Sequence, residues 1–288
     1  LSIPEIVAAI NDPMGTGAFE QDGMNIFGPN LGNPNLIEET ADTITYGFVF
    51  TPQFLSGFTL IADYYEIEVE DAIASVDSQL AVDLCFNDPN FDNRFCDSVN
   101  RDADGQISRI LNREENLNEL ISEGIDVTLE YDFGLPAVPG NFTSQVIYTR
   151  VLTNEERFDG PDGEEVDDFA GEVGLPEDEY RWILRWLWDD LQIRYRLNYT
   201  GTVVDTNAPD PADLAADVKF EQVLVHDIYA RYRFGDDGRY EVYGGINNIE
   251  DQHGPYLPDG FVNGENSNVG DPYDAVGRRF YLGFRVGL

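Results

Sequence analysis

The sequence predicts an all-β protein, an antiparallel transmembrane β-barrel, from three observations. Apolar and polar residues alternate along many segments, short and long connections alternate between those segments, and aromatic residues and arginines hold particular places in them. Successive side chains of a strand point to opposite faces, so an alternating segment has one apolar and one polar face. We therefore expect a partial barrel of about nine strands.

The expected strands share this alternation and end at turn residues. They lie at 43–52, 58–70, 120–133, 141–152, 180–188, 191–201, 223–235, 239–248 and 278–288. In the strand at 191–201, Ile193, Tyr195 and Leu197 lie on one face, and Arg194 and Arg196 lie on the other. Alternation alone does not separate a membrane barrel from a soluble β-sandwich, because both have one apolar and one polar face.

The connections run short, long, short, long along the chain. The short ones are Pro52–Gly57, Gly134–Gly140, Asp189-Asp190 and Asp236–Gly238. Outer-membrane barrels have short periplasmic turns and long outer loops, so this rhythm favours a membrane barrel whose last strand ends in the periplasm. Single-chain bacterial barrels have an even number of strands. Nine strands are an odd set, so we expect an N-terminal part to precede this sequence.

Aromatic residues lie near the ends of the expected strands, as in the interfacial belts of membrane proteins. They are Tyr64, Tyr65, Tyr131, Phe133, Tyr180, Trp188, Tyr199, Phe234 and Tyr240. For any one of them, ordinary β-propensity is the alternative explanation. Many arginines fall on polar strand faces, which suits the wall of a wet lumen. They are Arg185, Arg194, Arg196, Arg231, Arg233, Arg279 and Arg285.

Composition excludes one large class of partner. The formal net charge of −38 over 288 residues should repel phosphates, so we expect no binding to nucleic acid. An aromatic content of 12% argues against a disordered chain of high charge. No apolar run is long enough for a transmembrane helix.

The chain has two cysteines, Cys85 and Cys96, in a polar stretch. Two thiols without clustered histidines make a poor metal site. We interpret them as a loop-closing disulfide, which implies an oxidising compartment. The alternative is a pair of free thiols.

Five motifs occur in order between Gly32 and the C-terminus. They are Gly32-Asn33-Pro34-Asn35-Leu36, Asp63-Tyr64-Tyr65-Glu66-Ile67, Glu123-Gly124-Ile125-Asp126, Gly245-Ile246-Asn247-Asn248-Ile249, and Tyr273-Asp274 with Gly277-Arg278-Arg279-Phe280-Tyr281. Together they resemble the barrel of TonB-dependent receptors. The chain departs from that family at Leu288, where an aromatic residue is usual, and at Ile37-Glu38, where the family often has Lys-Pro.

The resemblance implies a 22-stranded barrel closed by an N-terminal plug, of which residues 1–288 form the C-terminal part without the plug. It implies a place in the outer membrane of a Gram-negative bacterium, among lipopolysaccharide and outer-membrane lipid. The implied activity is import of a scarce, bulky ligand, energised by the TonB–ExbB–ExbD complex through the plug. Iron–siderophores, cobalamin and oligosaccharides are such ligands. The cysteine-containing loop and the Asp-Tyr-Tyr strand resemble those of receptors from aquatic and soil proteobacteria. Many of these receptors import carbohydrates, which favours an oligosaccharide.

Polar and aromatic groups near the outer rim are the candidate ligand contacts. Aromatic rings stack on sugars, and an arginine guanidinium can donate hydrogen bonds to two oxygens at once. The expected lumen residues are Tyr65, Arg181, Asn247, Arg279 and Tyr281, and Tyr256 and Phe261 lie in the last outer loop. The alternative is structural: each residue pairs across strands or touches the plug.

Two acidic stretches are candidate cation sites. Asn100, Asp102 and Asp104 have the spacing of the first oxygen ligands of a calcium loop, although Leu111 stands at the closing position. The alternative there is a solvated Asp-Gly hairpin turn. The acidic run from Asp159 to Asp168 is either a solvated outer loop or a divalent-cation bridge to lipopolysaccharide phosphates. No other cofactor is expected.

Nothing in the sequence predicts an enzyme. His226 and Asp227 fall on opposite faces of their strand, so they should not pair as a catalytic dyad. Two other functions remain alternatives to the transporter. One is a secreted soluble all-β module that binds carbohydrate, and the other is a barrel enzyme, for which the sequence offers no catalytic set.

Overall fold

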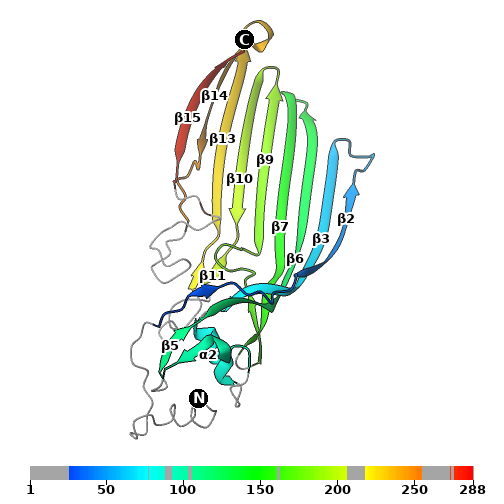
Figure 1. Ribbon diagram of the computed structural model, residues 1–288. Helices are drawn as coiled ribbons and strands as arrows, with labels where there is room; N and C mark the ends of the chain where they lie inside the picture. The colour runs from blue at the N-terminus through cyan, green and yellow to red at the C-terminus, as the bar shows by residue number, and fades with distance from the viewer. Residues whose placement is uncertain are drawn as a thin grey trace. The chain divides into compact units, whose positions relative to one another are not determined.

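Nine long strands form one antiparallel meander, as the sequence predicts. They are β2 (Thr40–Phe50), β3 (Phe58–Val76), β6 (Asn112–Leu135), β7 (Val138–Gly160), β9 (Asp178–Trp188), β10 (Leu191–Thr200), β13 (Val223–Phe234), β14 (Tyr240–Asn247) and β15 (Arg279–Val286). In the sheet each strand lies beside its neighbours in the meander, from β15 to β2 (Figure 1). The path ends at β2 and β15 without closing, which confirms the partial barrel.

This computed structural model describes residues 26–76, 78–87, 93–102, 106–160, 163–205, 218–254, 273 and 276–287. The chain divides into two compact units. The first comprises Leu1–Asp42, Glu68–Ile121 and Glu156–Asp167, and the second comprises Thr43–Ile67, Ser122–Glu155 and Asp168–Leu288. In the described part of the chain, no helix combines the length and the apolar character needed to span a bilayer.

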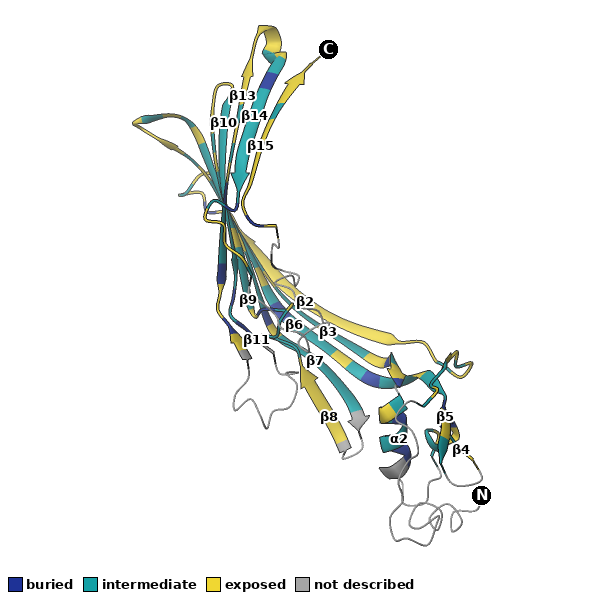
Figure 2. Cartoon of the chain, turned by 90° about the vertical axis from the view of Figure 1, so that its left-hand side faces the viewer, coloured by how far each residue is buried: buried dark blue, intermediate teal, exposed yellow. Residues whose placement is uncertain are grey.

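Strand register in the second unit turns the alternating sequence into two distinct faces. Ile193 pairs with Trp186 on the apolar face, and Asn198 pairs with Arg181 on the polar face. The apolar face is not covered: Leu282 on β15 is 82% exposed. Figure 2 shows β2 and β15, the two edge strands, as exposed. A continuous exposed apolar face of this kind is rare in a soluble monomer and suits contact with lipid.

Aromatic side chains form rows at both ends of the apolar face. Toward the short turns, a chain of stacked and edge-on ring contacts joins Phe50, Phe58, Tyr131, Phe133, Phe142, Trp186 and Trp188. Toward the long loops, Tyr180 stacks on Tyr199 with a centroid distance of 4.6 Å. On β9 these rows are separated by the residues from Tyr180 to Trp186, roughly 20 Å of strand. Such a spacing is close to the apolar band of a membrane barrel.

The alternation of short and long connections is also confirmed. The short turns join β2 to β3, β6 to β7, β9 to β10 and β13 to β14, and the last of these contains η2 (Asp236–Gly238). Asp189 and Asp237 have positive φ angles of 46° and 58°, a conformation that Asp and Asn tolerate better than most residues. The long loops leave the opposite ends of the strands (Figure 1).

The long connection between β3 and β6 folds into structure of its own in the first unit. It contains α2 (Ser78–Asn87), η1 (Cys96–Ser98) and the hairpin of β4 (Val99–Arg101) and β5 (Ile107–Ile110). Val76, Ala81 and Ile110 form its buried core. A disulfide joins Cys85 to Cys96, as predicted, and ties α2 to η1. The remaining short strands are β1 (Asn30–Leu31), β8 (Gly163–Asp168), β11 (Val203–Asp205) and β12 (Val218–Phe220).

Strands β3, β6 and β7 extend beyond the segments that alternation predicts. Strand β6 begins at Asn112 instead of 120, and β7 continues to Gly160 instead of 152. Alternation reports a difference between two faces, and it is lost along the extensions of β6 and β7, where most residues of both faces are polar. Backbone pairing does not need that difference, so the strands continue. Helix α2 was not predicted either, although Leu80, Ala81 and Leu84 have helical spacing.

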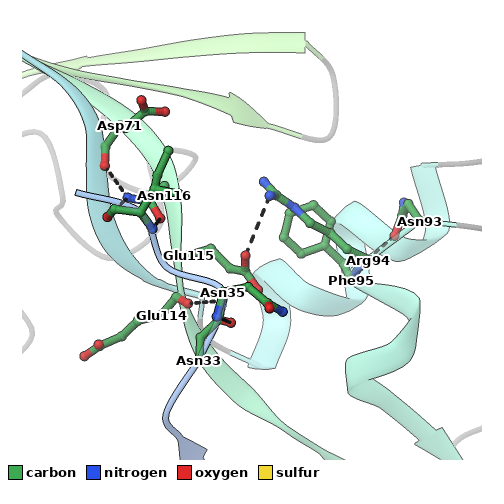
Figure 3. A network of polar contacts seen from close by, with 10 residues as sticks. Asn33, Asn35, Asp71, Asn93, Arg94, Phe95, Glu114, Glu115 and Asn116 are labelled. Carbon is green, nitrogen blue, oxygen red and sulfur yellow. Dashed lines mark hydrogen bonds and ion pairs between the residues drawn. The ribbon is translucent and has the colours of Figure 1, made fainter. Parts of the chain in front are cut away.

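The first motif, around Asn33, is held against β6 by amide side chains (Figure 3). Asn33 donates from Nδ2 to the Glu114 carbonyl at 2.9 Å. The Oδ1 of Asn116 accepts the Ile37 N–H at 3.0 Å, and its Nδ2 donates to the Asp71 carbonyl at 2.6 Å. An amide carries both donors and an acceptor, so Asn116 can bond to two backbone segments at once.

Candidate ligand-binding site

A cavity of about 520 Å³ opens on the polar face of the second unit, where the long loops leave β9, β10, β13, β14 and β15. Its lining includes Arg181, Asn247 and Arg279, so the structure brings together three of the predicted ligand contacts. The other polar residues in the lining are Thr149, Glu179, Tyr180, Arg196, Asn198, Tyr199, Thr200, Asp227 and Tyr273.

Arg181 is placed by strand register. It lies opposite Asn198 on β10 and opposite Ile147 on β7, and all three residues line the cavity. Arg181 donates from Nε to the Asn198 Oδ1 at 3.0 Å. One edge of the guanidinium is thereby oriented by the protein, while the side chain remains exposed to the cavity.

Arg196 is held by a buried carboxylate. Its Nη2 and Nε lie 2.5 Å and 2.7 Å from the Asp227 Oδ2, and the Asp227 side chain is 9% exposed. Asp227 lies on the polar face, while His226 lies on the other face with its Nδ1 2.5 Å from the Tyr195 hydroxyl oxygen. His226 and Asp227 therefore bond to different partners and do not form a dyad.

Asn248 shapes the chain as it leaves β14. It is 1% exposed, has a φ of 54°, and donates its backbone N–H to the Asp227 Oδ1 at 2.8 Å. Its side chain donates to the Gln252 carbonyl at 2.6 Å and accepts the Gln252 N–H at 2.7 Å. These bonds close the turn beside Asn247. Sequence reasoning noted Asn248 as a motif residue and missed this role.

Asp251 fixes the start of β15, where Arg279 enters the cavity. Its Oδ1 accepts the Arg278 N–H at 2.7 Å, and its Oδ2 lies 3.5 Å from the Arg278 Nη2. The hydrogen bond from the Arg278 backbone, with the charge of that guanidinium, lowers the pKa of Asp251. The folded state therefore favours the carboxylate form of Asp251.

We expect this anchor to weaken in acid. A carboxyl group whose folded pKa is lowered contributes stability above its ordinary pKa, and that contribution is lost as the pH falls below about 4. Hydrogen exchange of the Arg278 amide, corrected for its intrinsic rate at each pH, should then accelerate. Asp251→Asn removes the titrating group and should abolish the pH dependence. The same acceleration in that variant would contradict this account.

Tyr273 supplies a buried hydroxyl to the cavity. The residue is 8% exposed and packs with Val203, Phe220 and Val223 in a small core. Among the described residues, no atom pairs with its hydroxyl group. Burial raises the pKa of the Tyr273 hydroxyl, and the charge of Glu179 adds to that effect. The hydroxyl is therefore protonated at neutral pH and can donate to a ligand in the cavity.

Tyr273→Phe should affect stability and binding in opposite directions. A buried polar group without a partner costs about 1–3 kcal/mol, so its removal should raise the free energy of unfolding without ligand. Ligand affinity should fall, because the bound ligand loses a donor. Thermal unfolding with and without ligand measures both. Loss of stability in the unliganded variant would mean that the hydroxyl already has a partner in the protein.

The other predicted contacts lie elsewhere. A Cβ built on Gly124 would lie 2.4 Å from the Tyr65 hydroxyl, and one built on Gly245 would lie 2.7 Å from the Tyr281 hydroxyl. Both tyrosines thus lie over glycines of neighbouring strands and outside the cavity lining. Tyr256, Phe261 and Asp104 fall outside the described residues.

The predicted calcium ligands lie around the β4–β5 hairpin. Asn100 donates its amide to the Ser98 carbonyl at 3.1 Å, and Asp102 accepts the Gln106 N–H at 3.0 Å. Within the described ranges, no cluster of three His, Cys, Asp or Glu residues is arranged to hold a metal ion. Calcium binding remains a prediction.

Comparison with known proteins identifies the family. Residues 9–249 match the TonB-dependent receptor-like β-barrel family. No match was found among curated proteins. The structure resembles the FrpB iron transporter from Neisseria meningitidis, with a TM-score of 0.55, 16% identity, and 90% of this chain and 33% of that chain covered. It also resembles the ferric enterobactin receptor PfeA from Pseudomonas aeruginosa, in a complex with BCV-L6, with a TM-score of 0.60, 15% identity, and 90% and 33% covered.

At these identities the solved structures show the fold alone, and this chain spans about a third of their length. The family match extends over most of the sequence, from the segment before β1 to the turn after β14. The chain belongs to the TonB-dependent receptor-like β-barrel family.

Proposed function

We propose that this chain forms part of an outer-membrane receptor that imports a scarce, bulky ligand with energy supplied through TonB, ExbB and ExbD. The observation that carries this proposal is the family match over residues 9–249. The exposed apolar face of the sheet, with its two aromatic rows, supports a position in the outer membrane among lipopolysaccharide and lipid. A secreted soluble carbohydrate-binding module is not favoured, because that face would be open to water.

We propose the cavity near Arg181 as the ligand contact on this part of the barrel wall. Arg181, Arg196 and Arg279 converge on it, with Asp227 already engaged by Arg196. Guanidinium groups bind carboxylate and other anionic oxygens in a bidentate geometry, and the Tyr273 hydroxyl adds a neutral donor. The site therefore fits an anionic, oxygen-rich ligand.

An anionic metal chelate replaces the oligosaccharide as our favoured ligand. The similar structures include an iron transporter and a receptor for ferric enterobactin, and nothing in the comparisons supports a preference for oligosaccharides. A neutral sugar also offers no charge to a lining in which three arginines outnumber the two carboxylates, Glu179 and Asp227. We propose a receptor and not an enzyme.

Uptake measurements test this function. The full-length receptor would be produced in a Gram-negative host that lacks its own siderophore receptors, with and without a functional tonB gene. We expect TonB-dependent uptake of radioactive iron from ferric enterobactin or ferric citrate, and none of labelled maltooligosaccharides. TonB-dependent sugar uptake without iron uptake would refute the chelate. Absence of any TonB dependence would refute the transporter.

Arginine substitutions test the site. Arg181→Gln and Arg279→Gln should each weaken chelate binding about tenfold or more, because a hydrogen bond to a charged group contributes about 1.5–3 kcal/mol. Arg150→Gln is the matched control. Arg150 pairs with Glu177 and Asp178 and does not line the cavity, so its loss should leave binding unchanged. Equal effects from all three variants would place the ligand elsewhere.

A further inference from the structure

Strand register divides the lining of the cavity around Arg181 into rows. In the row farthest from the long loops, which we call the inner row, Arg196 lies opposite Asp227 and Arg279 lies opposite Asn247. Arg181 lies one row nearer the loops. The three arginines of the lining therefore belong to the inner part of the cavity.

The row nearest the long loops, which we call the outer row, has no arginine among the described residues that line the cavity. Glu179 lies there opposite Thr149 on β7 and opposite Thr200 on β10. Tyr273 lies close to this row, because its ring packs with Val223, the β13 partner of Thr200. The outer row is four residues beyond the inner row on β10, or about 13 Å along the strand.

The polar groups of the outer row need both donors and acceptors from a ligand. Thr149 donates its own hydroxyl proton to the Asp126 Oδ1 at 2.6 Å, so its oxygen keeps only lone pairs for a ligand. The ionised Glu179 carboxylate also only accepts. The buried Tyr273 hydroxyl has no partner among the described residues, and it is available to donate. A ligand group in this row should therefore donate to Thr149 or Glu179 and accept from Tyr273.

A hydroxyl group meets both requirements, because it carries one donor and two lone pairs. A carboxylate or phenolate of the ligand only accepts, and it would lie beside the negative charge of Glu179. An ammonium group only donates, and it would leave the buried Tyr273 hydroxyl without an acceptor. The outer row thus favours an uncharged hydroxyl over either kind of ion.

The two ends of the cavity therefore fit different parts of one molecule. On the proposed function of a chelate receptor, we infer that the ligand is an anionic metal chelate that carries neutral hydroxyl groups at one end. Its anionic oxygens bind in the inner part of the cavity, where the arginines lie. Its hydroxyl groups bind in the outer row. Sites that hydrogen-bond a ligand hydroxyl discriminate strongly against analogues without it, so the outer row determines specificity.

A matched pair of chelates tests this inference in the full-length receptor, purified in detergent. Ferric enterobactin and its diglucosylated form share one anionic chelating core, and only the second carries sugar hydroxyls. Isothermal titration calorimetry would measure both affinities for the wild type, Thr200→Val and Glu179→Gln. Thr143→Val is the matched control, because Thr143 donates to Asp132 and does not line the cavity. Retained binding stoichiometry checks that each variant is folded.

We expect the wild type to bind the diglucosylated chelate about tenfold more tightly, the effect of one or two added hydrogen bonds. Thr200→Val and Glu179→Gln should each lower this ratio by about threefold or more. Glu179→Gln should also tighten ferric enterobactin, since it removes a like charge. Thr143→Val should leave both affinities unchanged.

Two kinds of failure are distinguishable. Equal wild-type affinities for the two chelates, or a ratio that neither cavity substitution changes, would overturn the hydroxyl-bearing ligand and leave the chelate receptor standing. If neither chelate binds, the proposed chelate receptor fails, and the hydroxyl-bearing ligand fails with it.

Discussion

Asp227→Ala should lower the free energy of unfolding of the second unit by about 1–3 kcal/mol, the cost of leaving the buried Asn248 N–H without an acceptor, because the Arg196 side chain is 37% exposed and is screened by water. Asp227 is almost fully buried, bonds to Arg196 and accepts the Asn248 backbone N–H. Its loss would leave both donors unpaired and free the turn after β14. All three tryptophans of the chain lie on β9, so tryptophan fluorescence during urea unfolding in lipid or detergent reports on this sheet.

Two further variants separate the charge from the hydrogen bond. Asp227→Asn keeps an acceptor for the Asn248 N–H and should cost less than alanine. Combining Asp227→Asn with Arg196→Gln should recover part of the loss, because no unpaired charge then remains. If Asp227→Ala costs less than about 1 kcal/mol, the ion pair is solvated and does not organise the cavity.

Removing the disulfide by the double substitution Cys85→Ser and Cys96→Ser should destabilise the first unit by about 3 kcal/mol. The bond closes a short loop, and in the chain-entropy account a loop of this size contributes that amount by restricting the unfolded state. The core of Val76, Ala81 and Ile110 is small, so this loss is a large part of its stability. Hydrogen exchange of the α2 amides measures the local free energy.

Serine also places a polar group where Cys85 is buried, so the variant needs a chemical control. Reduction of the wild-type receptor by a phosphine should accelerate α2 exchange by a similar factor. The β9 amides in the second unit should be unaffected by both treatments. Unchanged exchange in α2 after reduction would mean that packing alone holds this loop.

The strands of the second unit were predictable because a membrane barrel repeats one local rule. Each residue faces either lipid or water, so the side-chain pattern reports the strand directly. The same rule selected three ligand contacts that line the cavity: Arg181, Asn247 and Arg279. Their positions in the alternating pattern place them on the polar face near the long loops. The three side chains meet at one cavity because of the order of the strands in the sheet. The short turns, which join consecutive strands, already suggested this order.

Other parts of the site depended on contacts between distant segments. Tyr273 is a buried donor because β11, β12 and β13 supply the core around its ring. Asn248 shapes its turn because Asp227 on another strand accepts its N–H. The alternating pattern also places Tyr65 and Tyr281 on the polar face. In the structure, however, each of them covers a glycine on the adjacent strand. No local pattern contains these partners.

The division between pattern and tertiary structure has a physical cause. Alternation, turn residues and aromatic positions were enough to predict the nine strands, their two faces and the alternation of short and long connections. Each of these features is set by residues that are close in the sequence. Pairing of Arg185 with Arg194, clustering of three arginines around Glu241, and the folding of α2 onto its core arise from register and long-range packing. Only the folded chain brings those residues within reach of one another.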